Sequence, residues 1–312
     1  MRLWCGIGAA ALVVALGSMP VFGQPPVPDS AGFEARLSAA VSTLAETEPR
    51  LKQLPLPKRQ ALIEFVIGNM LFVTTHEVGH GVLTELAIPN VGRDEDAADA
   101  FAILTALKLG SSFSHRVLIE AAKGWYLADL RDQKTGEKPT YFDAHAMNLQ
   151  RAYHIVCLMV GSDPEKYKEL ADIAGMPTDR QQSCQDDFRT AQWSWETLLK
   201  PHLRAAEQPA QQVEVVYGPA RGRLEVYARS FHELRFLEPL VEHLVRHFAW
   251  PKPLTMEMQS CGEIGANWRS RRLKLCYEMA EDFAELYAEY GDRLKSLKPR
   301  TPLPVRDLRR AR

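Results

Sequence analysis

The chain has 312 residues, of which 46% are hydrophobic and 25% charged, and its formal net charge is −1. This composition excludes a fibrous or wholly disordered protein, and the length allows one large domain or two modest ones with a buried core. A near-neutral chain also gives no electrostatic reason to expect a nucleic-acid partner, because phosphate binding needs a clustered basic surface.

The first 23 residues are predicted to be a signal peptide. Arg2 precedes an apolar run over residues 9–16, and Val21-Phe22-Gly23 places modest or small residues where a signal peptidase would cut. The apolar run is short and interrupted, so an uncleaved membrane anchor is the less favoured alternative. We therefore expect an exported protein, periplasmic or extracellular, with no stable transmembrane segment after cleavage.

Residues 24–57 are expected to form a proline-containing leader and a helix with apolar spacing over 34–44. Residues 58–86 show helical periodicity on a strongly apolar sequence, which predicts a largely buried helix. Asp94 is the expected N-cap of a second helix that ends near Leu109. Further helices are expected at 114–131, 146–160, 164–174 and 186–204.

Residues 58–205 thus form a predicted helical region, and residues 213–298 a second region that mixes helices and strands. In this second region we expect strands at 213–217, 223–227, 254–258 and 273–276, and helices at 234–248 and 277–290. Residues 299–312 contain arginines and prolines and are predicted to be a disordered basic tail. The predicted fold class is mainly α with a small β-sheet (α+β).

The segment His76-Glu77-Val78-Gly79-His80 matches H-E-x-x-H inside the most apolar predicted helix. Residues four apart share a helix face, so both imidazoles can point at one ion. Glu77 lies beside them, where it can accept a proton from a metal-activated water. Burying two histidines and a glutamate without an ion or partners would be costly. The pattern therefore predicts a Zn²⁺ site with His76 and His80 as ligands and Glu77 as the general base.

A catalytic zinc ion normally has three protein ligands and one open position. Leu86 stands six residues after His80, where metzincins carry a histidine, so that class is excluded. In the acidic run that follows, Glu95 and Asp99 are four apart and face the same way if the run begins a helix. We expect Glu95 to bind zinc and Asp99 to accept the free ring N–H of a ligand histidine. Asp96 and Asp99 remain alternative third ligands, and the dipole of the helix N-terminus is an alternative reason for the run.

H-E-V-G-H followed by E-D-A-A-D-A-F resembles the thermolysin-like gluzincins and, more closely, a bacterial family of proposed metallopeptidases. The second resemblance covers most of the chain after the signal peptide. It implies a zincin-like fold, in which an active-site helix lies against strands, and hydrolysis of peptide or protein substrates. Trp268 departs from the pattern, in which a small residue and then an aromatic follow Asn267. Later blocks that carry the resemblance are Gln150-Arg151-Ala152-Tyr153 up to Cys157, Gly161 to Pro164, Cys184, Trp195, Cys261-Gly262, and Asn267 through Cys276-Tyr277-Glu278.

The gluzincin resemblance implies one further catalytic residue. Asp143-Ala144-His145, which opens a helix through Asn148 and Tyr153, resembles the segment that supplies a histidine to the oxyanion. His145 is therefore expected to stabilise developing negative charge. A surface histidine at a helix start is the alternative interpretation.

Four cysteines remain after the predicted signal peptide: Cys157, Cys184, Cys261 and Cys276. An even count in an exported chain favours disulfides, and three pairings are possible. Local pairing, Cys157 with Cys184 and Cys261 with Cys276, would close one loop in each half of the chain. The alternative is that some of the cysteines are small buried apolar residues.

Three other features bear on function. His243 and His247 are four apart, but no carboxylate lies between them, so a solvated helix face is favoured over a second metal site. Glu85 is expected to face away from the zinc site and to be structural. Asn267 and the strand that ends at Cys276 are expected to form either an edge strand for a peptide substrate or a disulfide-stapled hairpin without substrate contact.

Two functions follow from these features. The first is an exported zinc-dependent metallopeptidase that hydrolyses peptide bonds. The second is a non-catalytic, zincin-like zinc-binding protein that acts as a binding module in the cell envelope. A structural zinc site would close the fourth position with another protein ligand, and the sequence near the motif offers no candidate for it. The presence of Glu77 therefore favours the enzyme.

Overall fold

The structure is a computed structural model that describes residues 30–47, 51–138 and 140–296. The predicted signal peptide and the predicted basic tail lie outside these residues. Within them the chain is mainly helical with one small sheet, which confirms the expected fold class. The helices are α1 (Ser30–Thr47), α2 (Leu56–Glu85), α3 (Asp94–Leu109), α4 (Ser112–Thr135), α5 (Asn148–Ser162), α6 (Pro164–Ile173), α7 (Thr178–Leu199), α8 (Glu225–Leu234), α9 (Glu238–His243) and α10 (Tyr277–Tyr290), and the strands are β1 (Val213–Tyr217), β2 (Leu254–Gln259), β3 (Ala266–Arg269) and β4 (Arg272–Cys276).

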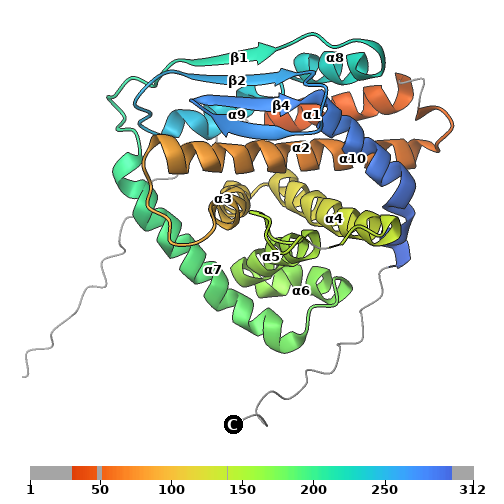
Figure 1. Cartoon of the computed structure of the whole chain (residues 1–312), viewed down its shortest axis with the longest axis horizontal. Coiled ribbons are helices and arrows are strands. Elements are labelled where there is room, and N and C mark those ends of the chain that lie inside the picture. Colours follow the sequence, from red (N-terminus) through yellow and green to blue (C-terminus); the bar gives the residue numbers. More distant parts are fainter. Residues whose placement is uncertain (1–29, 48–50, 139, 297–312) are drawn as a thin grey trace, which may run out of the picture.

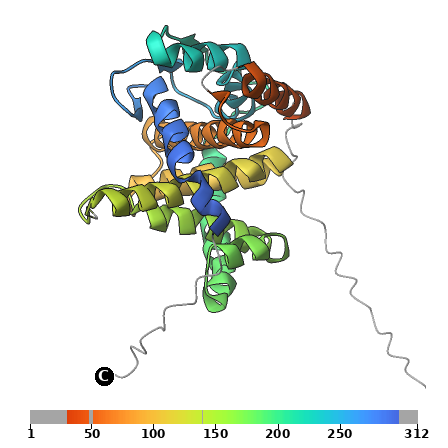
Figure 2. The same cartoon turned by 90° about the vertical axis from the view of Figure 1, so that its right-hand side faces the viewer.

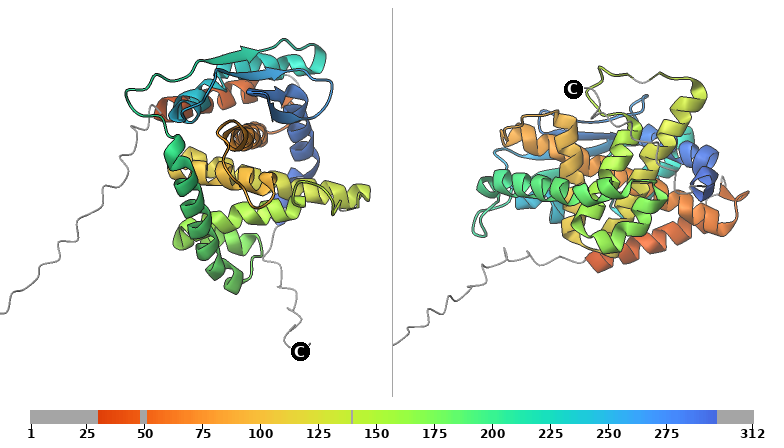
Figure 3. Two further views of the ribbon diagram at one scale, coloured as in Figure 1. Left: turned by 60° about the vertical axis from the view of Figure 1, so that its left-hand side comes forward. Right: turned by 90° about the horizontal axis from the view of Figure 1, so that it is seen from below.

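Helix α2 lies at the centre of the molecule. The sheet covers one side of α2, and α3, α4 and α5 lie on the other side (Figure 1). Figure 2 shows the same layers from the side, with α5 and α6 farther from the sheet than α4, and the left view of Figure 3 looks nearly along α2. Phe65, Met70 and Val78 of α2 are completely buried, and this surrounding protein explains the almost continuous apolar sequence. By length and composition α2 could also cross a membrane, but 78% of its most apolar window is buried within the protein.

The sheet has the strand order β1-β2-β4-β3. Strand β2 pairs in parallel with both β1 and β4, whereas β3 and β4 form an antiparallel hairpin. Ser270 and Arg271 at the tip of this hairpin have φ angles of 51° and 63°, the left-handed pair that a tight two-residue hairpin turn requires. Asn267 therefore lies on the edge strand β3. The strand that ends at Cys276, expected at the edge with it, is an inner strand.

The segment at 223–227, which the sequence suggested to be a strand, is helical. A short 3₁₀ turn over Gly222–Leu224 leads directly into α8. Tyr227, Phe231 and Leu234 recur at helical spacing, and burial of Phe231 and Leu234 stabilises the helix over an extended strand.

The helix expected at 234–248 is interrupted at two places. Arg235 ends α8 with a left-handed φ of 51°, and α9 extends only to His243. Leu244 then leaves the helical conformation, and a 3₁₀ turn follows over Val245–His247. His243 and His247 consequently do not belong to one helix.

Two other helix boundaries differ from the expectation. Arg93, not Asp94, is the N-cap of α3, so the acidic run forms the first turn itself, where carboxylates interact favourably with the helix dipole. Helix α7 begins at Thr178, after Pro177, well before the expected residue 186, and ends at Leu199.

Two disulfides link the described cysteines by the local pairing. Cys157–Cys184 joins α5 to α7, and Cys261–Cys276 joins the segment after β2 to the end of β4. Structural disulfides persist in oxidising compartments, so this cysteine usage fits an exported protein.

Candidate metal centre

The candidate centre forms where α3 crosses α2. Gly79 lies between the two histidines of α2, and a Cβ atom there would be 3.1 Å from the Cα atom of Ala98. The lack of a side chain at Gly79 therefore lets the two helices approach closely. Because Glu95 and Asp99 are one turn apart on α3, this approach brings both carboxylates to the histidines.

Three donor atoms converge at this crossing. Nε2 of His76 lies 3.1 Å from Nε2 of His80 and 3.1 Å from Oε2 of Glu95, and Nε2 of His80 lies 3.3 Å from the same oxygen. Ligands bound to tetrahedral zinc at 2.0–2.1 Å lie about 3.3 Å from one another. The separations and the donor types therefore fit a zinc ion held by two imidazoles and a carboxylate.

Asp99 orients the first histidine. Nδ1 of His76 lies 2.8 Å from Oδ1 of Asp99 and donates to it, which directs Nε2 toward the other donors. Arg151 donates to both oxygens of Asp99, at 2.8 and 2.6 Å, and its guanidinium lies 3.7 Å from the ring centroid of Trp125. Asp99 and Arg151 are only 5% and 7% exposed, so each buried charge compensates the other.

The acidic surroundings of the histidines favour a positive charge at the centre. In the absence of a metal ion, burial lowers the pKa of His76, but hydrogen bonds with Asp99 and Glu95 outweigh it and raise this pKa to about 9. Burial raises the pKa of Asp99 and of Glu95, but their hydrogen bonds hold both pKa values well below the ordinary range. Glu95 is therefore an ionised carboxylate at the position that a cation would occupy, and Asp99 is a second ionised carboxylate on the far side of the His76 ring.

Glu77 lies on the neighbouring face of α2 and is 8% exposed. Burial raises the pKa of its carboxyl group, while His76, His80 and the backbone N–H of Trp268 act in the opposite direction; the pKa remains above its ordinary value. A raised pKa makes a carboxylate a better proton acceptor near neutral pH.

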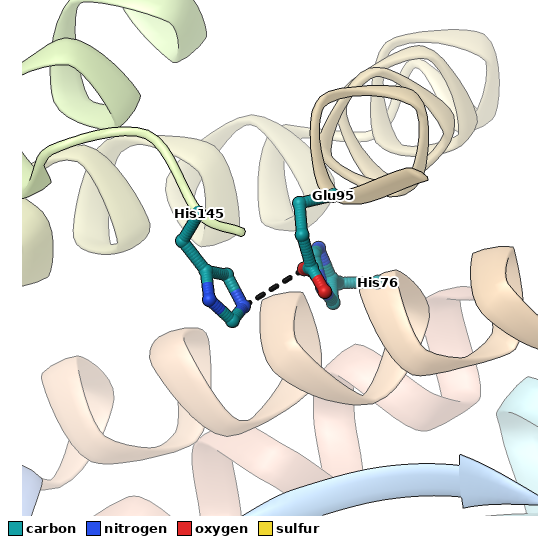
Figure 4. Close-up of side chains that lie close together, drawn as sticks. All are labelled: His76, Glu95 and His145. Atoms are coloured by element: carbon teal, nitrogen blue, oxygen red, sulfur yellow. Dashed lines mark hydrogen bonds and ion pairs between the residues drawn. The ribbon is translucent and has the colours of Figure 1, made fainter. Parts of the chain in front are cut away.

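His145 reaches the centre from the segment before α5, not from the helix start itself (Figure 4). Its Nε2 atom lies 2.8 Å from Oε2 of Glu95, and its ring faces that of His76 with a centroid separation of 6.3 Å. Asp143 accepts the backbone N–H of His145 and lies 3.2 Å from its Nδ1 atom. The hydrogen bond to Glu95 is the main cause of a raised pKa at His145. Ligand atoms of His76, Glu95 and His145 all lie within 4.8 Å of one another, so His145 is also a candidate metal ligand.

A cavity of about 500 Å³ opens beside His145. Arg151 lines it together with Lys138, but the charge of Arg151 is paired with Asp99. The cavity thus offers an acidic space next to the candidate centre. Its carboxylates are Asp129, Asp132, Glu137 and Asp143.

Two other carboxylates near the motif face elsewhere. Asp96, an alternative third ligand, pairs with Arg93 at 2.9 and 3.0 Å. Glu85 accepts hydrogen bonds from the backbone of Arg271 and the indole of Trp268, so it binds the β3–β4 hairpin.

Arg151 and Trp268 contribute to the centre although the sequence analysis gave them no role. Arg151 had a usable signal, because it stands four residues before Ile155 and seven before Leu158 on the apolar face of α5. A charged residue on such a face needs a buried partner. Trp268 had no local signal, because its contact with α2 depends on how the hairpin packs.

A protein-family model with the description "Putative metallopeptidase" matches residues 37–199, which is more than half of the chain. The matched residues include α2, α3, His145 and Arg151, and they end before the sheet. Comparison with the curated proteins and with the solved structures found no match.

Proposed function

The chain belongs to the family described as "Putative metallopeptidase", and we propose on this premise that it is an exported zinc-dependent peptidase, active in the periplasm or outside the cell. Membership of this family implies a metal ion and peptide or protein substrates. The observation that carries the finer proposal is the convergence of His76, His80 and Glu95 at tetrahedral separations, with Glu77 beside them. Two imidazoles and one carboxylate are a donor set typical of catalytic zinc.

His76 and His80 would hold the ion through Nε2, and Glu95 through a carboxylate oxygen. Zinc, when bound, supplies Lewis acidity that polarises a carbonyl group and lowers the pKa of a water molecule from 15.7 to about 7. Asp99 keeps the proton of His76 on Nδ1, so the lone pair of Nε2 stays available.

Two side chains act on the substrate in this proposal. Glu77 accepts the proton of the attacking water and then gives it to the departing amine. His145 carries an N–H group beside Glu95 and would donate it to the oxygen on which negative charge develops.

The proposal is tested by measuring metal content and peptide hydrolysis on the same preparation. We expect about one zinc ion per chain. Hydrolysis of a broad peptide library should be lost on chelation and restored by zinc. His80→Ala should lose both the metal and the activity, whereas His232→Ala, a change at an exposed histidine of α8, should keep both. Wild-type protein that binds no metal would contradict the proposal.

His145 supports a second candidate function, that of a non-catalytic zinc-binding protein of the cell envelope. If His145 ligates the ion together with the three donors above, four protein ligands close the site, as in structural zinc centres. The sequence near the motif offered no such fourth ligand. In the folded chain His145 lies beside Glu95 and forms a candidate ligand group with His76 and Glu95, and its ring would have to move toward His80 to complete a set of four.

His145→Ala distinguishes the two functions. If His145 is the oxyanion donor, the variant should keep its zinc while its turnover falls by about 10²- to 10³-fold. Zinc titration and the visible spectrum of the cobalt-substituted protein report whether a ligand is lost. A weakened metal affinity with an altered cobalt spectrum would favour the structural site, and an unchanged turnover would refute the oxyanion role.

A further inference from the structure

Helix α2 has two adjacent faces that carry residues of the proposed site. His76 and His80 form the metal face, and Glu77, Gly81 and Glu85 follow at the same four-residue spacing one position along. Residues with this spacing lie above one another on a helix. The second face contacts the β3–β4 hairpin, so the proposed base shares its face with residues that bind the edge of the sheet.

Gly81 provides the place where the hairpin lies on this face. A Cβ atom at Gly81 would be 2.5–2.7 Å from three ring atoms of Trp268, so only glycine allows the indole to lie on the helix. The ring of Trp250 stacks against the same indole, with centroids 5.9 Å apart and planes 20° apart. Trp268 is thus held between α2 and Trp250.

Glu85 fixes the hairpin one turn further along. Its Oε1 atom accepts the backbone N–H of Arg271 at 2.9 Å and the indole N–H of Trp268 at 3.4 Å. Arg271 belongs to the left-handed turn between β3 and β4. One carboxylate therefore holds both the turn and the ring of the hairpin.

The hairpin in turn contacts the proposed base. Trp268 lies on α2 one turn from the proposed base, because Gly81, which its ring covers, is four residues after Glu77, and its backbone N–H faces the Glu77 carboxylate. A glutamate has three rotatable side-chain bonds, and a fixed donor restricts the directions in which its oxygens point. The orientation of Glu77 thus depends on the position of β3.

We propose that Glu85 is a positioning residue for the reaction, because it holds the hairpin on α2 so that Trp268 orients the carboxylate of Glu77. This inference rests on the proposed peptidase function, in which Glu77 is the base. Glu85 acts through Trp268 and contacts none of the proposed metal ligands.

The activity test compares Glu85→Ala with Glu85→Gln. Alanine removes the acceptor of both hydrogen bonds, whereas glutamine keeps an oxygen at the same place. We expect Glu85→Ala to lower kcat by about 10- to 100-fold with KM and zinc content close to wild type, and Glu85→Gln to restore most of kcat. Glu257→Ala is the matched control, because it removes a carboxylate of the same sheet that pairs with Arg272 of β4; it should leave kcat unchanged.

Amide hydrogen exchange of the folded, metal-free protein tests the same contact without activity. Exchange at Trp268 and Arg271 should be faster in Glu85→Ala than in wild type or Glu85→Gln. Faster exchange with a lowered kcat supports the inference, whereas unchanged exchange, or an unchanged kcat at full zinc content, overturns it.

Two further measurements cover a variant that does not fold and a wild-type protein that is inactive. If Glu85→Ala fails to fold, Gly81→Ala reaches the same contact from the other side, because the added methyl group displaces the Trp268 ring. Its kcat should fall at full zinc content, and a wild-type kcat would overturn the inference. A wild-type protein without hydrolytic activity would overturn the proposed function and with it the positioning role of Glu85 in the reaction, whereas the exchange rates would still show whether Glu85 holds the hairpin.

Discussion

Replacing Glu77 with glutamine is expected to lower peptide hydrolysis by about 10²- to 10⁴-fold while zinc remains bound. The amide has nearly the same shape as the carboxylate but cannot accept the proton of the attacking water. Zinc should be retained because the proposed ligands are His76, His80 and Glu95, and Glu77 is on the neighbouring face of α2. The measurement is turnover of a peptide substrate together with zinc stoichiometry on the same samples.

A matched control for this variant is Glu120→Gln. Glu120 is a half-buried glutamate whose pKa is likewise raised by burial, but it pairs with Lys123 on α4, away from the candidate centre. It should keep wild-type turnover. A Glu77→Gln protein that hydrolyses peptides at the wild-type rate with its zinc in place would show that another group is the base.

Replacing Arg151 with methionine is expected to destabilise the metal-free protein by about 3–5 kcal/mol. The change leaves the carboxylate of Asp99 buried with His76 as its remaining charged partner. Because His76 is shared with Glu95, the buried charge of Asp99 is then only partly compensated, which is costly in the protein interior. Zinc affinity should also fall, by about 10- to 100-fold, because Asp99 then orients His76 less firmly. Urea unfolding and competitive zinc titration measure the two effects.

Arg131→Met is the matched control for the stability measurement. Arg131 also pairs with an aspartate of another helix, Asp282 of α10, at 2.7 Å, but their side chains are 36% and 18% exposed. Breaking a pair that water can reach should cost only about 0–1 kcal/mol. Adding Asp99→Asn to Arg151→Met removes the uncompensated charge and should recover part of the lost stability. Equal effects of the two arginine variants would contradict the assignment of Arg151 as the compensating charge.

The parts of the centre that could be predicted from the sequence are the pairs of residues whose spacing puts them on one face of the same helix. The spacing of His76 and His80, and of Glu95 and Asp99, puts each pair on one helix face, and the structure brings the four side chains together. Arg151 was missed because its partner comes from a different helix, and pairing between helices depends on their packing.

The sheet region shows the same division between local and long-range causes. Three strands and α10 were expected close to where they occur, because the strands largely alternate apolar and polar residues and α10 repeats apolar residues at helical spacing. The first three residues of α8 were predicted to belong to a strand at 223–227, because Gly218-Pro219 and Gly222 precede them and Val226 and Tyr227 favour strands locally. Burial of Phe231 and Leu234 against the core stabilises the helix over the strand, and no local pattern reveals this burial.

The close approach of α2 and α3 at Gly79 has a consequence for the order of events during folding. All three proposed metal donors lie on two consecutive helices separated by residues 86–93, and closing so short a loop costs little chain entropy. The hairpin that contacts Glu77 comes from the other end of the described chain and docks only when the intervening segments have folded. In the proposed peptidase, the residues that would hold the ion can therefore come together before the proposed base Glu77 is oriented by the hairpin.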